Sequence, residues 1–216
     1  MSQEIVHMVC TEMALQAAVE KGVRCKNGVY RFFDPGASLV TLRDFPVIRQ
    51  QKLVYRRAWF EPYDWATCQD TPQERTLRIP VEGSFGEKFL AQQKLLTPEE
   101  EVSSTRIVTM FLVINALATG ERLLLDRWVR CIDKDSDGCR VRVGGCDADG
   151  LDILNCWDDE HGQDLGVSAT LVVAGLEAPK PRRDTDIVCK PTPRRRRCGY
   201  HDDGGTFIMR GSGDVG

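Results

Sequence analysis

The hydrophobic and polar positions of the first 76 residues predict one helix, a hairpin and two further strands. Residues 8–21, MVCTEMALQAAVEK, are rich in residues that favour helices and stop before Gly22. Asn27-Gly28 separates two strand-like runs in RCKNGVYRFF, which is a hairpin signal. SLVTLRDF and KLVYRRAWF have the composition of strands. Residues 61–76 have the composition of a loop.

The clearest predicted element is an apolar helix over residues 98–118. Thr97 would be its N-cap, Pro98 suits the first turn, and Glu100 would complete a capping box with Thr97. The stretch RIVTMFLVINALA is apolar on nearly every side and stops near Gly120, so we expect it to be buried by other elements. Before it, TLRIPVEGSF predicts a short strand that ends in a Gly-rich turn.

Short strands with polar turns follow this helix. They are RLLLDRWVRCID, CRVRVGG, LDILNCW and GVSATLVVAGL, and the turns DKDSDG and DADG separate the first three. A helix followed by a cluster of antiparallel strands predicts an α+β fold.

Composition and charge divide the chain into three parts. Its 216 residues are 42% hydrophobic and 28% charged, a globular balance. We expect an N-terminal α/β region over 1–80, a domain with the helix and strand cluster over 81–176, and a Pro/Gly-rich disordered tail over 177–216. Residues 1–176 carry 20 basic and 26 acidic side chains, whereas the tail carries 9 basic and 6 acidic ones.

The same numbers bear on partners and on location. The formal net charge of −3 does not favour nucleic acid as a partner, which we expect to be unlikely. No run of 18 apolar residues is present, so we expect no membrane span. The first ten residues, MSQEIVHMVC, lack the pattern of a signal peptide, which predicts a cytoplasmic protein.

Cysteine and aspartate patterns were weighed as metal sites. No two of the nine cysteines have Cys-x-x-Cys spacing, so we expect no structural zinc. Because an export signal is not evident in the sequence, we expect free thiols, with disulfides as the alternative. Asp133, Asp135 and Asp137, followed by Gly138, match the opening of a calcium loop, but the twelfth position is Gly144 where an EF-hand needs Glu. Hairpin turn chemistry explains the same residues. We therefore expect no cofactor, with calcium at these aspartates as the alternative.

Three stretches resemble the target proteins, also called variable proteins, of bacterial diversity-generating retroelements. They are FLAQQKLLTPEEEVSSTR, LATGERLLLDRWVRCIDKDSDGCRVRVGG and CDADGLDILNCWDDEHGQDLGVSA. The last resembles a pattern of Asp-Gly-Leu, a variable stretch, Trp-Asp-Asp, further variable positions and Leu-Gly-Val-Ser. The resemblance implies that 81–176 form a C-type-lectin-like domain, related to formylglycine-generating enzymes, whose side chains are diversified by adenine-directed mutagenesis.

What this resemblance implies is a non-enzymatic protein that binds a protein or other macromolecule through a diversified patch. A scaffold would hold the patch in place; its positions would be Gly144, Gly145, Gly150, Trp157, Asp158, Gly166 and Val167. Ligand contacts would come from Cys146, Asp147, Asp152, Leu154, Asn155, Cys156, Asp159, His161, Gln163 and Asp164.

Two other classes of function remain open at this point. The Asp-rich loops would suit a calcium- or metal-dependent carbohydrate binder or enzyme. Arg194–Arg197, with Arg182, Arg183 and Lys190, would suit a nucleic-acid-associated protein that acts through its tail.

Overall fold

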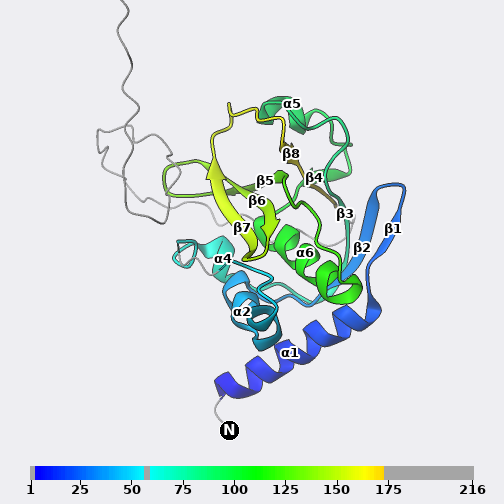
Figure 1. Cartoon of the computed structure of the whole chain (residues 1–216), viewed down its shortest axis with the longest axis vertical. Coiled ribbons are helices and arrows are strands. Elements are labelled where there is room, and N and C mark those ends of the chain that lie inside the picture. Colours follow the sequence, from blue (N-terminus) through cyan, green and yellow to red (C-terminus); the bar gives the residue numbers. More distant parts are fainter. Residues whose placement is uncertain (1–2, 56–58, 173–216) are drawn as a thin grey trace, which may run out of the picture. The chain divides into compact units, whose positions relative to one another are not determined.

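Helix α6, Thr105–Thr119, is the element against which strands of both sheets pack in this α+β fold. The computed structural model describes residues 3–55 and 59–172, with side chains from Thr11 onward (Figure 1). All residues of α6 from Thr105 to Asn115 are buried, which confirms the predicted apolar helix. Gly120 ends it at a φ of 75°, a left-handed conformation that glycine adopts without strain.

The strands form two sheets. Neighbouring strands of the five-stranded sheet are all antiparallel, and its order is β1 (Arg24–Lys26), β2 (Val29–Asp34), β3 (Gln73–Arg78), β9 (Ala169–Leu171) and β4 (Glu100–Val102). The order of the four-stranded sheet is β7 (Gly150–Cys156), β6 (Arg140–Asp147), β5 (Trp128–Lys134) and β8 (Leu165–Val167). Only β5 and β8 run parallel. The strand cluster predicted after the helix is confirmed, and the segment GVSATLVVAGL contributes one strand to each sheet.

Two N-terminal predictions are confirmed. Helix α1 spans Gln3–Lys21, so it begins before the expected residue 8 and ends where expected. The β1–β2 hairpin turns at Asn27 and Gly28, whose φ angles of 54° and 74° fit a type I′ turn.

Residues 38–76 differ most from the prediction. The expected strand SLVTLRDF is helix α2, Leu39–Asp44, because Ser38 Oγ accepts the Thr41 N–H at 3.1 Å and the helical spacing buries Leu39 and Leu42. Helix α3, Pro46–Gln50, follows it. In the expected strand KLVYRRAWF, the described residues make one isolated bridge, from Val54 to Leu151. The expected loop 61–76 contains helix α4, Asp64–Thr67, and the start of β3.

The predicted start of the long helix at residue 98 was also wrong. The Thr97 N–H does donate to Glu100 Oε2, at 2.9 Å, as in a capping box. Glu100 is drawn into strand β4, however, where Arg78 Nε donates to its Oε1 at 2.6 Å. The true N-cap is Ser104, whose hydroxyl accepts the Ile107 N–H. The segment before β4 holds helix α5, Phe89–Gln93.

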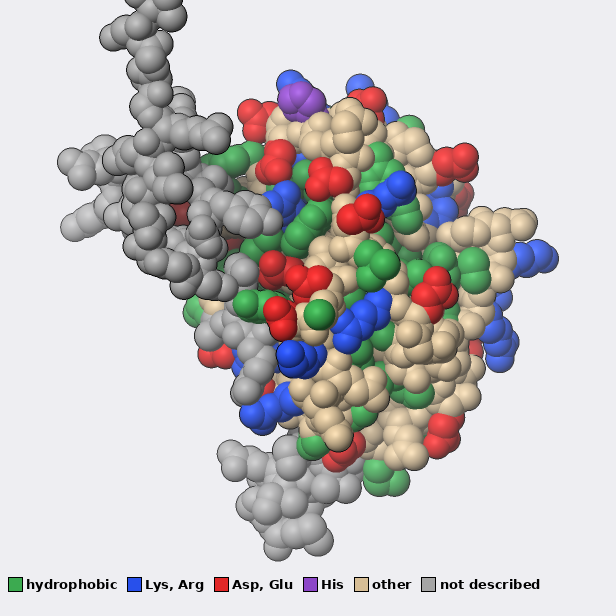
Figure 2. Space-filling model, in the orientation of Figure 1, with side chains coloured by type: hydrophobic (Ala, Val, Ile, Leu, Met, Phe, Trp, Pro, Cys, Tyr) green, Lys and Arg blue, Asp and Glu red, His purple; other side chains and the backbone are tan. Residues whose placement is uncertain are grey.

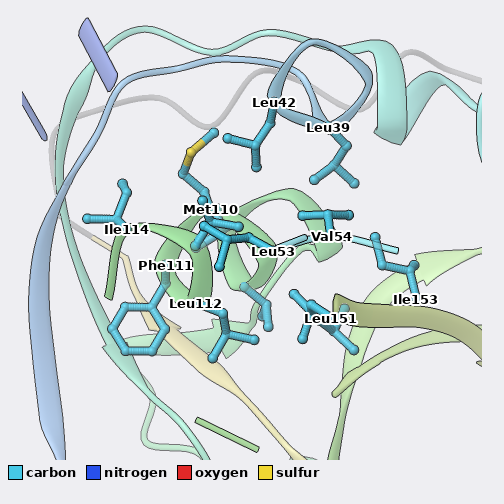
Figure 3. Packing of buried hydrophobic residues seen from close by; sticks show 14 of the residues in the cluster. Leu39, Leu42, Leu53, Val54, Met110, Phe111, Leu112, Ile114, Leu151 and Ile153 are labelled. Carbon is cyan, nitrogen blue, oxygen red and sulfur yellow. The ribbon is translucent and has the colours of Figure 1, made fainter. Parts of the chain in front are cut away.

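The main core surrounds α6. Figure 3 shows side chains from α2, from Leu53 and Val54, and from Leu151 and Ile153 of β7 gathered about Met110 and Leu112 of the helix. A second, smaller cluster of buried side chains is formed by Val81, Phe89, Val102, Val167 and Ala169.

Strands from both sides of residue 80 share the five-stranded sheet, since β3 pairs with β9. The boundary at residue 80 stays a prediction about domains. The tail predicted over 177–216 lies outside the described residues. In the part of the chain that the structure describes, helices long and apolar enough to span a bilayer are absent.

Phe111 joins the helix to the five-stranded sheet, and its loss should destabilise the fold. The fully buried Phe111 ring lies 4.9 Å from Tyr30 and 5.5 Å from Phe32, measured between ring centroids. We expect Phe111→Ala to lower the free energy of unfolding by about 3–5 kcal/mol in urea titrations, because it leaves a cavity. Met13→Ala, at a side chain that is 66% exposed, should change it by less than about 0.5 kcal/mol. Equal effects would contradict this account of the core.

Candidate ligand-binding surface

One face of the four-stranded sheet packs on the core and the other carries arginines. Val143 opposite Ile153 belongs to the core cluster around α6. Because side chains alternate along a strand, the cross-strand partners Arg130 and Arg142 point to the other face, here called the outer face. Arg140, two residues before Arg142, lies on the same face.

Arg130 is fully buried at the centre of the outer face. Its Nη1 donates to Gln92 Oε1 at 2.9 Å and to the Glu87 carbonyl at 3.2 Å. Its Nη2 donates to the carbonyls of Trp157, at 3.3 Å, and Glu160. All four acceptors are neutral oxygens, and two of them belong to the backbone of the loop 157–164. This guanidinium therefore holds the loop against the sheet through the backbone.

The other two arginines bind side chains of the same loop. Arg140 Nε lies 2.7 Å from Asp158 Oδ1, and its guanidinium stacks on Phe89 at 3.6 Å from the ring centroid. Arg142 Nη1 donates to Glu160 Oε1 at 3.0 Å. Three arginines on adjacent strands thus attach the loop at positions 157, 158 and 160.

Backbone contacts complete the attachment of the 157–164 loop. The Phe89 N–H donates to the Asp158 carbonyl at 3.1 Å, and the Trp128 N–H to the Asp164 carbonyl at 2.8 Å. Gln92, which is fully buried, donates to the Leu165 carbonyl at 3.0 Å just after the loop. The loop is consequently fixed at both ends and in the middle.

Four of the predicted ligand contacts project from this fixed loop. Asp159, His161, Gln163 and Asp164 are all exposed. His161 Nδ1 lies 3.1 Å from the Asp159 carbonyl, a contact to the loop itself. The loop therefore has bound positions at 157, 158 and 160, outward side chains at 159, 161, 163 and 164, and a glycine at 162.

The predicted contacts on β6 and β7 are more scattered. Asp152 and Leu154 lie on the outer face and are half-buried. Asn155 points to the opposite face, where its Nδ2 donates to Asp135 Oδ2 at 2.8 Å. Exposed Asp147 accepts the N–H groups of Asp149 and Gly150 in the β6–β7 turn. Of these four side chains, Asp152 and Leu154 share the outer face with the loop, whereas Asn155 and Asp147 lie elsewhere.

The two predicted cysteine contacts are buried, which corrects their assignment to the surface. Cys146 is 7% exposed and belongs to the main core, and Cys156 is 1% exposed under the outer face. Burial raises the pKa of both thiols, that of Cys156 to about 11. Both side chains fill space in the protein, so neither can touch a ligand in this conformation.

Two of the three aspartates expected to suit calcium, Asp133 and Asp135, bind the protein's own backbone. Asp133 Oδ2 accepts the Thr105 N–H at 2.6 Å, at the start of α6. Asp135 Oδ1 accepts the N–H groups of Asp137 and Cys139 at 3.0 and 2.9 Å, which stabilises the β5–β6 turn. Across residues 3–55 and 59–172, no group of three or more His, Cys, Asp or Glu side chains is placed to hold a metal ion.

Sequence reasoning missed the segment 84–86, which borders the loop. A Cβ on Gly86 would lie 3.0–3.3 Å from the Gln163 side chain, and a Cβ on Gly166 would lie 2.8 Å from Ser84 Oγ and 3.1 Å from the Phe85 ring. The two glycines in EGSFGE were the available signal for a close approach, but they read equally well as a turn.

We expect Arg130→Met to loosen the 157–164 loop and to lower the free energy of unfolding by about 3–5 kcal/mol. The change leaves three carbonyls and one amide oxygen without their buried donor. Hydrogen exchange read by mass spectrometry should accelerate in 157–164 more than in α6. The matched control is Arg49→Met, at an exposed arginine of α3, which should stay within about 0.5 kcal/mol of the parent. A loop that exchanges at the parent rate in the Arg130 variant would contradict the anchoring role.

We expect Cys156 to resist alkylation in the native protein. Its pKa of about 11, against the ordinary 9.0, lowers the thiolate fraction at pH 8 by about a hundredfold. The unfolded chain loses this proton near pH 9 and the native chain near pH 11, so native stability also falls as pH rises through this window. Site-resolved mass spectrometry should therefore show modification of Cys156 at least about a hundredfold slower in buffer than in urea. Equal rates would place this thiol at the surface.

Comparison of the chain with protein-family models, with curated proteins and with solved structures found no match.

Proposed function

We propose that this chain is a non-enzymatic binding protein that displays a diversified patch of side chains on a C-type-lectin-like scaffold. The observation that carries the proposal is the division of positions within the 157–164 loop. The Trp157 carbonyl and the carboxylates of Asp158 and Glu160 bind the sheet, while the side chains of Asp159, His161, Gln163 and Asp164 face solvent. Side chains at the exposed positions can change without removing a contact that holds the loop.

The glycines expected to belong to the scaffold support the same proposal. A Cβ on Gly144 would lie 2.0 Å from the Arg127 carbonyl, and one on Gly145 would lie 2.4 Å from the Trp128 ring. A Cβ on Gly150 would lie 2.9 Å from the Tyr55 nitrogen, at a φ of 126°. Such positions exclude every other residue type unless the backbone moves. A diversified segment needs fixed positions of this kind between its variable ones.

The ligand that suits the patch is a macromolecule with a basic or polar surface. Asp159 and Asp164 are exposed on the loop, and Asp152 lies half-buried on the neighbouring strand. Carboxylates attract complementary charge and accelerate encounter with it. Such binding would be salt-dependent, since exposed charges are screened within about 8 Å at physiological ionic strength.

The experiment is deep sequencing of the DNA that encodes residues 130–175 across a source population. We expect substitutions at adenines, with side chains of every class at 159, 161, 163 and 164. Positions 130, 144, 150 and 166 should stay fixed, and the buried positions 146 and 156 should accept only small apolar residues. Positions 146 and 156 serve as the internal control. They lie in the same segment and should mutate equally often, but packing restricts which residues are tolerated there. Even variation without adenine bias would overturn the proposal.

A further inference from the structure

The β1–β2 hairpin presents a cluster of exposed basic side chains on one face. Arg24 of β1 lies directly opposite Arg31 of β2, so the two side chains share a face. Lys26, two residues after Arg24, lies on that face as well. All three side chains are exposed. We call Arg24, Lys26 and Arg31 the basic face.

The basic face is the solvent side of this part of the sheet. Tyr30, on the opposite face, packs on Phe111 of α6 at 4.9 Å between ring centroids. Figure 2 shows basic side chains along the right-hand edge of the molecule, where Figure 1 places β1 and β2. The face is therefore open to a partner, and its direction is fixed by packing behind it.

Neighbouring acidic groups do not neutralise the basic face. Among the described residues, carboxylates within ion-pair distance of Arg24, Lys26 or Arg31 are absent. Arg78, further along the same face of β3, is already bound by Glu100. Glu74 is opposite Phe33 at the far end of β2, where Lys21 covers the Phe33 ring. Three positive charges therefore remain at the hairpin end.

Placing two arginines directly opposite each other carries a cost. Like charges at such a pair repel and destabilise the hairpin, and an anion bound between them would remove the repulsion. Thr76, the cross-strand neighbour of Arg31 on β3, adds a hydroxyl donor beside them.

We propose that the basic face binds the phosphate backbone of double-stranded nucleic acid without reading its sequence. Arg24 and Lys26 are separated by about 6.6–6.8 Å along their strand, so the face offers a row of cations to a row of phosphates. Exposed large apolar side chains, which insertion into a lipid surface would use, are absent from β1–β3 in the described structure. Tyr30 and Phe32 of β2 pack on Phe111, and Lys21 covers the Phe33 ring, so the aromatic rings of the hairpin are not available for base stacking. The negative net charge of the whole chain gives no indication of this local positive surface.

The test measures anisotropy of a fluorescent DNA duplex of about 20 base pairs with the full chain over a range of KCl concentrations. Each phosphate contact contributes about −0.9 to the slope of log K against log [KCl]. Replacing Arg24, Lys26 and Arg31 by Gln should make the slope less steep by about 3 and weaken binding about tenfold or more at low salt. The matched control replaces exposed Lys88, Lys94 and Lys134 by Gln, with the same change in charge and no expected change in slope.

Two further arms separate this face from other sources of binding. A variant with Gln at 194–197 measures the contribution of the tail, which should add to that of the basic face. Arg31→Gln should also raise the melting temperature without DNA by about 1–4 °C, because it removes the like-charge pair. An unchanged slope in the hairpin variant would overturn the proposal. The hairpin variant is also tested for binding to phosphatidylserine vesicles. If it loses vesicle binding while its DNA binding stays intact, the basic face binds a membrane surface and the proposal is overturned.

Discussion

The hydrogen bonds of the buried Arg130 guanidinium are the interactions on which the positions of the 157–164 loop and the segment around α5 depend. A buried charge needs hydrogen-bond partners, and four acceptors from residues 87, 92, 157 and 160 meet at the Nη1 and Nη2 atoms of this group. Its Nε has no hydrogen-bond partner among the described residues. Those acceptors come from the segment around α5 and from the 157–164 loop, so both must lie on the sheet for the charge to be tolerated. A purely apolar contact would hold them less specifically, because hydrogen bonds have direction.

Because of this attachment, the backbone path of the loop does not depend on the identity of most of its side chains. Arg130 binds carbonyl oxygens, which every residue type provides, while Arg140 and Arg142 depend on the carboxylates of Asp158 and Glu160. The loop can therefore keep its path while its exposed side chains differ. The same attachment explains how the polar, exposed 157–164 loop can hold a fixed conformation without a hydrophobic core of its own.

Local chemistry was enough to predict some elements and not others. Asn27-Gly28 and the apolar run before Gly120 act through neighbours in the sequence, and both predictions were confirmed. Thr97 and Glu100 also make the expected local contact, but Arg78, distant in the sequence, takes Glu100 into a strand. Arg130 could not be recognised, because an arginine in the strand RWVRCID looks like an ordinary exposed position. Cys146 and Cys156 were misplaced for the same reason, since burial depends on elements that cover the sheet from elsewhere.

Charge shows why a whole-chain average is a poor guide to partners. A net charge of −3 combines carboxylates around β6, β7 and the 157–164 loop with unpaired cations on the β1–β2 hairpin. Screening limits the reach of each exposed group to about 8 Å at physiological ionic strength, so a partner at one surface responds to that surface and hardly to the total. Arg24 and Arg31 remain side by side despite their repulsion, whereas Arg78 on the adjoining strand is neutralised by Glu100. That contrast between neighbouring arginines on one sheet, rather than the sum of charges, is the physical reason to treat the hairpin as a separate binding surface.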